Sequence, residues 1–193
     1  GIYFKGSLVG KPAVNILILL IGTILASWMG TTGAAILLIR PLIRANKERR
    51  YKVHTVVFFI FLVANVGGLL TPLGDPPLFL GYLMGVPFLW TAVLWKEWLF
   101  VNGSLLAIYF VWDRFICYPK EQVPDIAKDE TQVRRLQFSG LWPNVPLLVG
   151  VVLAVALLAP GKPLLGWDPW MYAREIVQLA LVAVVQRKGV PQQ

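Results

Sequence analysis

One stretch decides the fold: Asn65-Val66-Gly67-Gly68-Leu69-Leu70-Thr71-Pro72-Leu73-Gly74-Asp75-Pro76-Pro77. Its three prolines and three glycines prevent a continuous helix, because proline lacks an amide donor and glycine loses the most backbone entropy. Apolar arms flank it at 53–64 and 78–90, and each would rise about 18–20 Å as a helix, roughly half of a hydrocarbon core of about 30 Å. The sequence therefore predicts a broken helix over 53–90, interrupted near the middle of a bilayer.

The composition places the whole chain in a membrane. Of 193 residues, 57% are hydrophobic and only 15% are charged, whereas soluble domains are about one-quarter charged. Several apolar runs approach the roughly 20 residues that cross a bilayer. We expect an all-α multispan helical bundle forming a single transmembrane domain over 1–193. The net charge of +8 fits basic cytoplasmic loops better than nucleic-acid binding, so no nucleic acid is expected as a partner.

The first apolar region has two interpretations. Residues 12–29 are apolar, Gly30-Thr31-Thr32-Gly33 breaks the run, and a second apolar piece covers 34–39. The region is either one long bent span or a re-entrant hairpin over 12–45. The segment 40–52 holds six basic residues and one acid, which predicts a cytoplasmic loop, and lysines also precede the first run. Basic flanks on both sides favour the hairpin.

The remaining spans follow from further apolar runs. We expect helices over 97–112, 143–160 and 171–186, with a cytoplasmic loop over 113–140 that carries a short surface helix from 125 to 137. This arrangement puts every basic cluster on one side of the membrane.

Asp75 is the sharpest functional candidate. A mid-membrane Asp costs about 2.5–3.5 kcal/mol on insertion scales, and such residues usually mark ion pathways or proton relays. The alternative is that Asp75 merely forms a turn outside the membrane, since Asp-Pro-Pro is a good turn sequence. The half-helix on each side favours the functional interpretation, in which the carboxylate binds a cation, a proton, or each in turn.

Neutral oxygens near Asp75 suit Na⁺, a hard cation, together with unwound backbone carbonyls. The candidates are Asn65, Thr71, Thr31 and Thr32. Simpler explanations compete: Asn65 as a helix C-cap and the two threonines as N-caps of the helix that follows. The residues expected to break the backbone are Gly67, Gly68, Pro72, Gly74, Pro76 and Pro77, with the first two glycines allowing close approach or positive φ.

Other polar residues have simpler explanations. His54 is interpreted as a helix-start residue beside the basic segment, and Arg174 with Glu175 as a local pair near an interface. No Walker loop, metal-ligand spacing or Ser-His-Asp arrangement is present. We therefore expect no enzyme, no cofactor and no metal beyond Na⁺ at Asp75.

The central motif resembles that of NhaD-type sodium/proton antiporters, in which Asn-x-Gly-Gly leads to Thr-Pro-x-Gly-Asp. The run from Asp75 to Gly81 is similar to bacterial proteins described as citrate transporters or sodium:proton antiporters. Both belong to the ion transporter superfamily. The resemblance covers residues 1–120 well and the rest loosely, and it is weaker at Gly30-Thr31-Thr32-Gly33.

The resemblance implies a fold of two inverted repeats, each with a re-entrant hairpin and a broken helix whose tips meet at a midplane site. Only one hairpin and one break are visible, so we expect the chain to be a fragment, the first half of such a transporter. The implied function is Na⁺/H⁺ antiport across a bacterial inner membrane, with citrate or another organic anion as the alternative substrate. Dimers are common in that superfamily, so a homodimer is a further expectation.

Two other classes of function compete with transport. An intramembrane aspartyl protease would need a membrane Gly-x-Gly-Asp motif, but Pro72 stands where the first Gly is required. It would also need a second membrane-depth Asp, whereas Asp113, Asp125, Asp129 and Asp168 are all expected in loops. An inactive remnant is the other alternative.

Overall fold

The computed structural model describes residues 3–5, 10–121, 137–139, 141–158 and 172–188. The chain forms two compact units, residues 4–137 and residues 1–3 with 138–193. The larger unit carries both the predicted hairpin and the central stretch, so it holds the candidate site.

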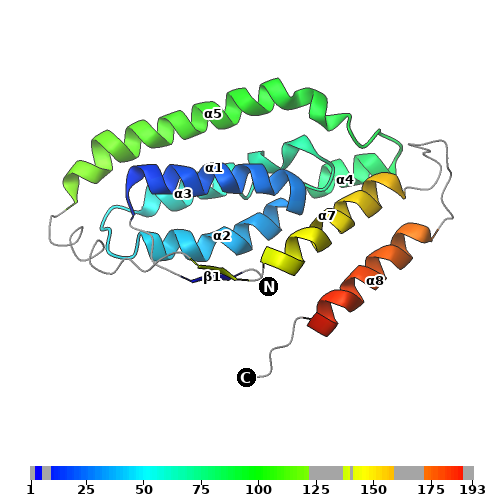
Figure 1. The fold of residues 1–193 in the computed structure, drawn as a ribbon. Helices are drawn as coiled ribbons and strands as arrows, with labels where there is room; N and C mark the ends of the chain where they lie inside the picture. The colour runs from blue at the N-terminus through cyan, green and yellow to red at the C-terminus, as the bar shows by residue number, and fades with distance from the viewer. Residues whose placement is uncertain (1–2, 6–9, 122–136, 140, 159–171, 189–193) are drawn as a thin grey trace. The chain divides into compact units, whose positions relative to one another are not determined.

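The larger unit begins with two helices, α1 (Pro12–Met29) and α2 (Thr31–Ala45), which meet at Gly30 (Figure 1). Gly30 has φ +84°, a left-handed conformation that glycine adopts without strain. Asn15 near the start of α1 exchanges hydrogen bonds with Asn46 just after α2. The two helices therefore form an antiparallel hairpin rather than one bent helix. That this hairpin is re-entrant stays a prediction.

The central stretch separates two helices. The elements are α3 (Val53–Leu62), the 3₁₀ turn η1 (Val66–Leu70) and α4 (Pro76–Leu83). The second arm is shorter than the apolar run suggested. It was expected to stay helical to Trp90, but α4 ends at Leu83 and Gly85 turns the chain at φ +115°. The apolar pattern extends past the helix because hydrophobicity alone does not mark a C-terminus.

A long helix completes the unit. After η2 (Thr91–Leu94), α5 (Trp95–Val111) continues as the π-helical η3 (Trp112–Cys117) and the 3₁₀ turn η4 (Tyr118–Lys120). The prediction that a loop begins at residue 113 is therefore wrong, because helical hydrogen bonding continues through that position. Residues 122–136 of the expected loop lie outside the described residues, and so does most of the expected surface helix over 125–137.

The hairpin, α3 and α5 share one core. Its fully buried members come from all of them and include Leu19, Leu42, Leu62, Val63 and Tyr109. Outward-facing side chains on the same helices are also apolar; Phe100 of α5 is 75% exposed. A helix that is apolar on all sides fits a lipid environment.

Three helical stretches among the described residues are long and apolar enough to cross a membrane: Pro12–Met29, Val53–Leu70 and Thr91–Lys120. The expected all-helical membrane fold is confirmed, with two short strands, β1 (Tyr3–Lys5) and β2 (Gln137–Ser139), at the points where the chain passes between the units. The smaller unit contains α7 (Leu141–Leu157) and α8 (Ala173–Lys188), which pack on each other.

Candidate functional site

The tip of the hairpin packs against the break in the central stretch. Ser27, near the end of α1, is fully buried, and its hydroxyl donates to the carbonyl of Gly67. The same hydroxyl accepts a hydrogen bond from the amide of Leu70 at 3.3 Å. One side chain thus satisfies a donor and an acceptor of η1, groups that an interrupted helix leaves without partners.

Two predicted threonines take part in this contact. The hydroxyl of Thr71 donates to the carbonyl of Ser27, and Thr71 is 6% exposed. The amide of Thr31 donates to the carbonyl of Gly74 at 3.0 Å, which joins the start of α2 to the segment before α4. The break is therefore held by both arms of the hairpin, one on each side of Gly30.

The glycines of the break permit contact between backbones. A Cβ atom on Gly74 would lie 1.8 Å from the carbonyl oxygen of Gly68, and one on Gly67 would lie 2.5 Å from that of Leu62. Among the described residues, only Gly30 and Gly85 have positive φ. Of the two explanations offered for Gly67 and Gly68, close approach is the one observed.

Asp75 is the residue that precedes α4. Its backbone is extended, at φ −143° and ψ 136°, and its carbonyl accepts from the amides of Leu78 and Phe79, both at 3.1 Å. The side chain is partly buried and does not cap the helix. Within the described part of the chain, its carboxylate has no hydrogen bond or ion pair. Pro76 and Pro77 follow as exposed residues of the first turn.

Other predicted site residues are not brought to this contact. Asn65 and Thr32 are both exposed. The C-cap of α3 is Val63, two residues before Asn65, and Asn65 makes no side-chain cap at η1 either. Thr31 and Thr32 both lie within α2, after Gly30 at its N-cap position. The capping explanations for Asn65 and for the two threonines are therefore wrong. Pro72, by contrast, is buried beside Thr71.

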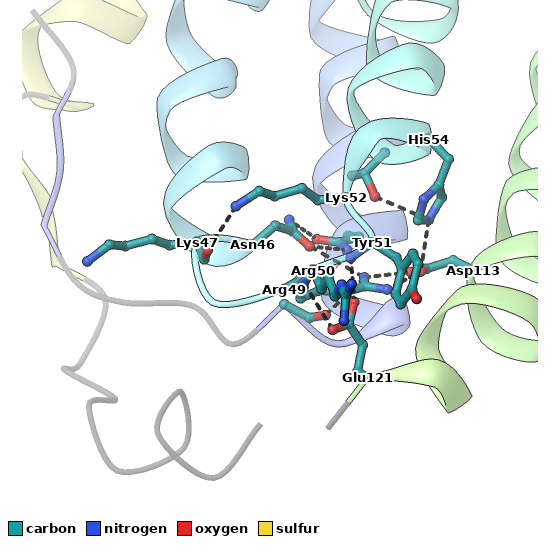
Figure 2. A network of polar contacts seen from close by, with 12 residues as sticks. Asn46, Lys47, Arg49, Arg50, Tyr51, Lys52, His54, Asp113 and Glu121 are labelled. Atoms are coloured by element: carbon teal, nitrogen blue, oxygen red, sulfur yellow. Dashed lines mark hydrogen bonds and ion pairs between the residues drawn. The ribbon is translucent and has the colours of Figure 1, made fainter. Parts of the chain in front are cut away.

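A second polar cluster lies at the opposite end of the hairpin (Figure 2). Arg49 is at its centre, and its side chain is 4% exposed. The guanidinium makes a bidentate pair with Asp113, at 2.5 and 3.1 Å, and approaches Glu121 at 3.4 Å. Although burial lowers the pKa of Arg49, its hydrogen bond and attraction to Asp113 outweigh that effect and raise the pKa above its ordinary value.

This cluster fastens several elements together. Asp113 also contacts His54 Nε2 at 3.0 Å and accepts from the hydroxyl of Tyr109 at 3.1 Å. Glu121 accepts from the backbone amides of Arg50 and Tyr51. Figure 2 shows Asp113 of η3 and Glu121, which follows η4, beside Arg49 in the connection between α2 and α3.

Sequence reasoning missed most of this cluster. The sequence predicts a loop at Asp113 and indicates no partner for His54, because their contact joins positions 59 residues apart. One signal was available: Asp113 follows Tyr109 by four residues, so both lie on one face of a helix if the helix continues. Ser27 offered a similar signal, because a hydroxyl within an otherwise apolar run indicates a buried side chain with a hydrogen-bond partner.

Among the described residues, no group of three His, Cys, Asp or Glu side chains is arranged to hold a metal ion. A family model described as "Putative citrate transport" matches residues 1–187. No curated protein and no solved structure matches the chain.

Proposed function

The chain belongs to the family described as "Putative citrate transport", and from that premise we propose that it is a secondary transporter that exchanges Na⁺ for H⁺. Membership of this family suggests a transporter rather than an enzyme. One observation carries the finer assignment: the carboxylate of Asp75 has no partner among the described residues and stands beside the break that the hairpin tip holds. We assign Asp75 as the group that binds Na⁺ and H⁺ in alternation.

The chemistry of an unpaired carboxylate supports this exchange. A carboxylate binds hard cations through oxygen and also takes up a proton, and it cannot do both fully at once. Competition between the two ligands at one group couples their movement. A carboxylate held in an ion pair, such as that of Asp113 with Arg49, would lack this freedom.

The start of α4 also favours a cation over an anion. Helix N-termini bind anions through free amide donors. Pro76 and Pro77 have no amide hydrogen, and the amides of Leu78 and Phe79 donate to the carbonyl of Asp75. This end of α4 therefore offers few donors to a carboxylate substrate, and the charge of Asp75 would repel one.

Citrate or another organic anion is the second candidate, and the family description favours it. A citrate site needs cationic side chains or free amides. Two arginines lie on α2, Arg40 and Arg44. Along the helix axis they lie about 13–20 Å from Thr31, the residue of α2 that contacts the break. Counter-flow of labelled citrate in proteoliposomes would distinguish the two substrates, because only an anion carrier accelerates it.

The test of the proposal is Na⁺-dependent proton movement in everted membrane vesicles. Asp75→Asn removes the charge with little change in shape and should abolish exchange. Glu97→Gln, at an exposed acid in the first turn of α5, is the matched control and should retain it. Full exchange by Asp75→Asn at normal expression would refute the assignment. We also expect residues 40–52 on the cytoplasmic side of a bacterial inner membrane, which cysteine labelling from each side would check.

A further inference from the structure

The outward face of α2 carries two arginines without counter-charges. Arg40 and Arg44 are four residues apart, so they lie on one side of the helix, and both are exposed. Within the described part of the chain, neither guanidinium group makes an ion pair or a hydrogen bond. The opposite side of α2 packs into the core of the larger unit through Ala34, Leu38 and Leu42. The two cations therefore point away from the core that the hairpin shares with α3 and α5.

Among the described residues, no acid neutralises this pair. Like charges four residues apart on a helix repel each other. The acid that follows along the chain, Glu48, pairs with Lys47 at 3.7 Å. The carbonyls at the end of α2 are also occupied: that of Leu42 accepts from the main-chain and side-chain amides of Asn46, and that of Arg44 accepts from the amide of Lys47. An anion from outside the chain would relieve the repulsion between the two guanidinium groups.

The depth of the pair in a bilayer indicates the source of that anion. Thr31, at the other end of α2, contacts the break, which we expect near the middle of the membrane. At about 1.5 Å per residue, Arg40 and Arg44 lie about 13 and 20 Å farther along the helix axis. The hydrocarbon core extends about 15 Å from the middle of a bilayer. The two arginines therefore lie on either side of the level where acyl chains end and phosphate headgroups begin.

The same face is apolar closer to the tip of the hairpin. Ile36, one turn before Arg40, is 69% exposed. An acyl chain can pack on this side chain while its phosphate reaches the arginines, and a guanidinium group binds phosphate through two parallel hydrogen bonds. A free anion such as inorganic phosphate or citrate has no apolar part to match Ile36. The pattern of the face therefore fits a phospholipid better than a soluble anion.

We propose that this face of α2, formed by Ile36, Arg40 and Arg44, binds an anionic phospholipid. The two guanidinium groups hold the phosphate, and an acyl chain lies along Ile36. Arginines near the end of a span also reach headgroups by snorkelling, which requires no particular lipid. A specific site differs in that its affinity depends on these two side chains and on a negative headgroup. The proposal does not depend on which ion is exchanged, so its failure leaves the assignment of Asp75 untouched.

The test is stabilisation of the purified full chain by lipid in mixed micelles. Dodecyl maltoside micelles receive increasing mole fractions of dioleoyl phosphatidylglycerol, which is anionic, or dioleoyl phosphatidylcholine, which is zwitterionic, at constant ionic strength. A ligand that binds only the folded chain raises Tm, which tryptophan fluorescence reports. Phosphatidylglycerol should raise Tm to a plateau, and phosphatidylcholine should not. Equal effects of the two lipids would refute the proposal.

Two double variants test whether the site is specific. Arg40→Gln/Arg44→Gln should weaken the apparent affinity for phosphatidylglycerol roughly thirtyfold, since each cation near an anionic surface contributes about fivefold. The control, Arg114→Gln/Lys120→Gln, removes two exposed cations from η3 and η4 and should keep the wild-type affinity. The two double variants change the net charge equally. An equal loss of affinity in both would indicate general charge attraction and would overturn the proposed site.

Soluble anions distinguish a lipid from other sources of negative charge. Inorganic phosphate and citrate, each added without lipid, should not produce the plateau in Tm. If either anion produces it and loses the effect in Arg40→Gln/Arg44→Gln, the site binds a soluble anion and the lipid proposal is wrong. If that double variant does not fold, Arg40→Gln and Arg44→Gln decide separately. Each should lose about fivefold in affinity for phosphatidylglycerol, and unchanged affinity in both would exclude the site.

Discussion

Neutralising Asp113 should strongly destabilise the larger unit. The carboxylate is fully buried and accepts two hydrogen bonds from Arg49 and one from Tyr109, with His54 Nε2 also 3.0 Å away. Asp113→Asn leaves the buried guanidinium with the Glu121 carboxylate at 3.4 Å and with neutral acceptors on Gly10 and Asn46. It also turns an amide donor toward other donors. Breaking one partner of a buried pair costs about 3–5 kcal/mol.

The effect is measurable by thermal unfolding in detergent, followed by tryptophan fluorescence. For a chain of this size, about 3–5 kcal/mol corresponds to a fall in Tm of roughly 6–20 °C. The control is Glu48→Gln, which breaks the exposed pair with Lys47 at 3.7 Å. Exposed pairs contribute about 0–1 kcal/mol, so Tm should change by less than about 4 °C.

A double-mutant cycle tests the mechanism behind that loss. Arg49→Met alone leaves the Asp113 carboxylate buried without its main counter-charge, so it should also be strongly destabilising. Asp113→Leu alone is the second single variant of the cycle. The double variant Arg49→Met/Asp113→Leu removes both charges, so its loss of stability should be clearly smaller than the sum of the two single losses. Additive losses, or an Asp113→Asn variant as stable as Glu48→Gln, would refute a central role for this ion pair.

Two further predictions concern the contact between the hairpin tip and the break. Gly74→Ala places a Cβ 1.8 Å from the carbonyl oxygen of Gly68 and should lower Tm and expression. Gly103→Ala, in open space on α5, is the control and should raise stability by about 0.5–1 kcal/mol. Equal Tm values for the two variants would contradict the close approach. Thr71→Val removes a buried hydroxyl that donates to α1 and should cost about 1–3 kcal/mol, while Thr32→Val at an exposed position should change stability by less than about 0.5 kcal/mol. Chemical denaturation in mixed micelles would measure both free energies of unfolding.

The break itself was predictable because its causes are local. Proline cannot donate to a helix, and the apolar runs on each side are long enough to become helical. The turn at Gly30 follows from the same kind of signal, a glycine between two apolar runs. The end of α4 was placed seven residues too late, at Trp90 instead of Leu83, since the apolar run continues beyond the helix. Composition marks what enters a membrane more reliably than where each helix ends.

The sequence by itself determined the membrane class, the broken helix and the place of Asp75 next to the second helical arm, since each depends on residues close together in the chain. Only the tertiary structure showed that the Asp75 carboxylate has no hydrogen bond or ion pair among the described residues. It alone also showed which side chains pair with Arg49. The Arg49–Asp113 pair joins residues 64 apart, and the hydrogen bond from Ser27 to Gly67 joins residues 40 apart. No periodicity encodes such pairings, because they depend on how whole helices pack.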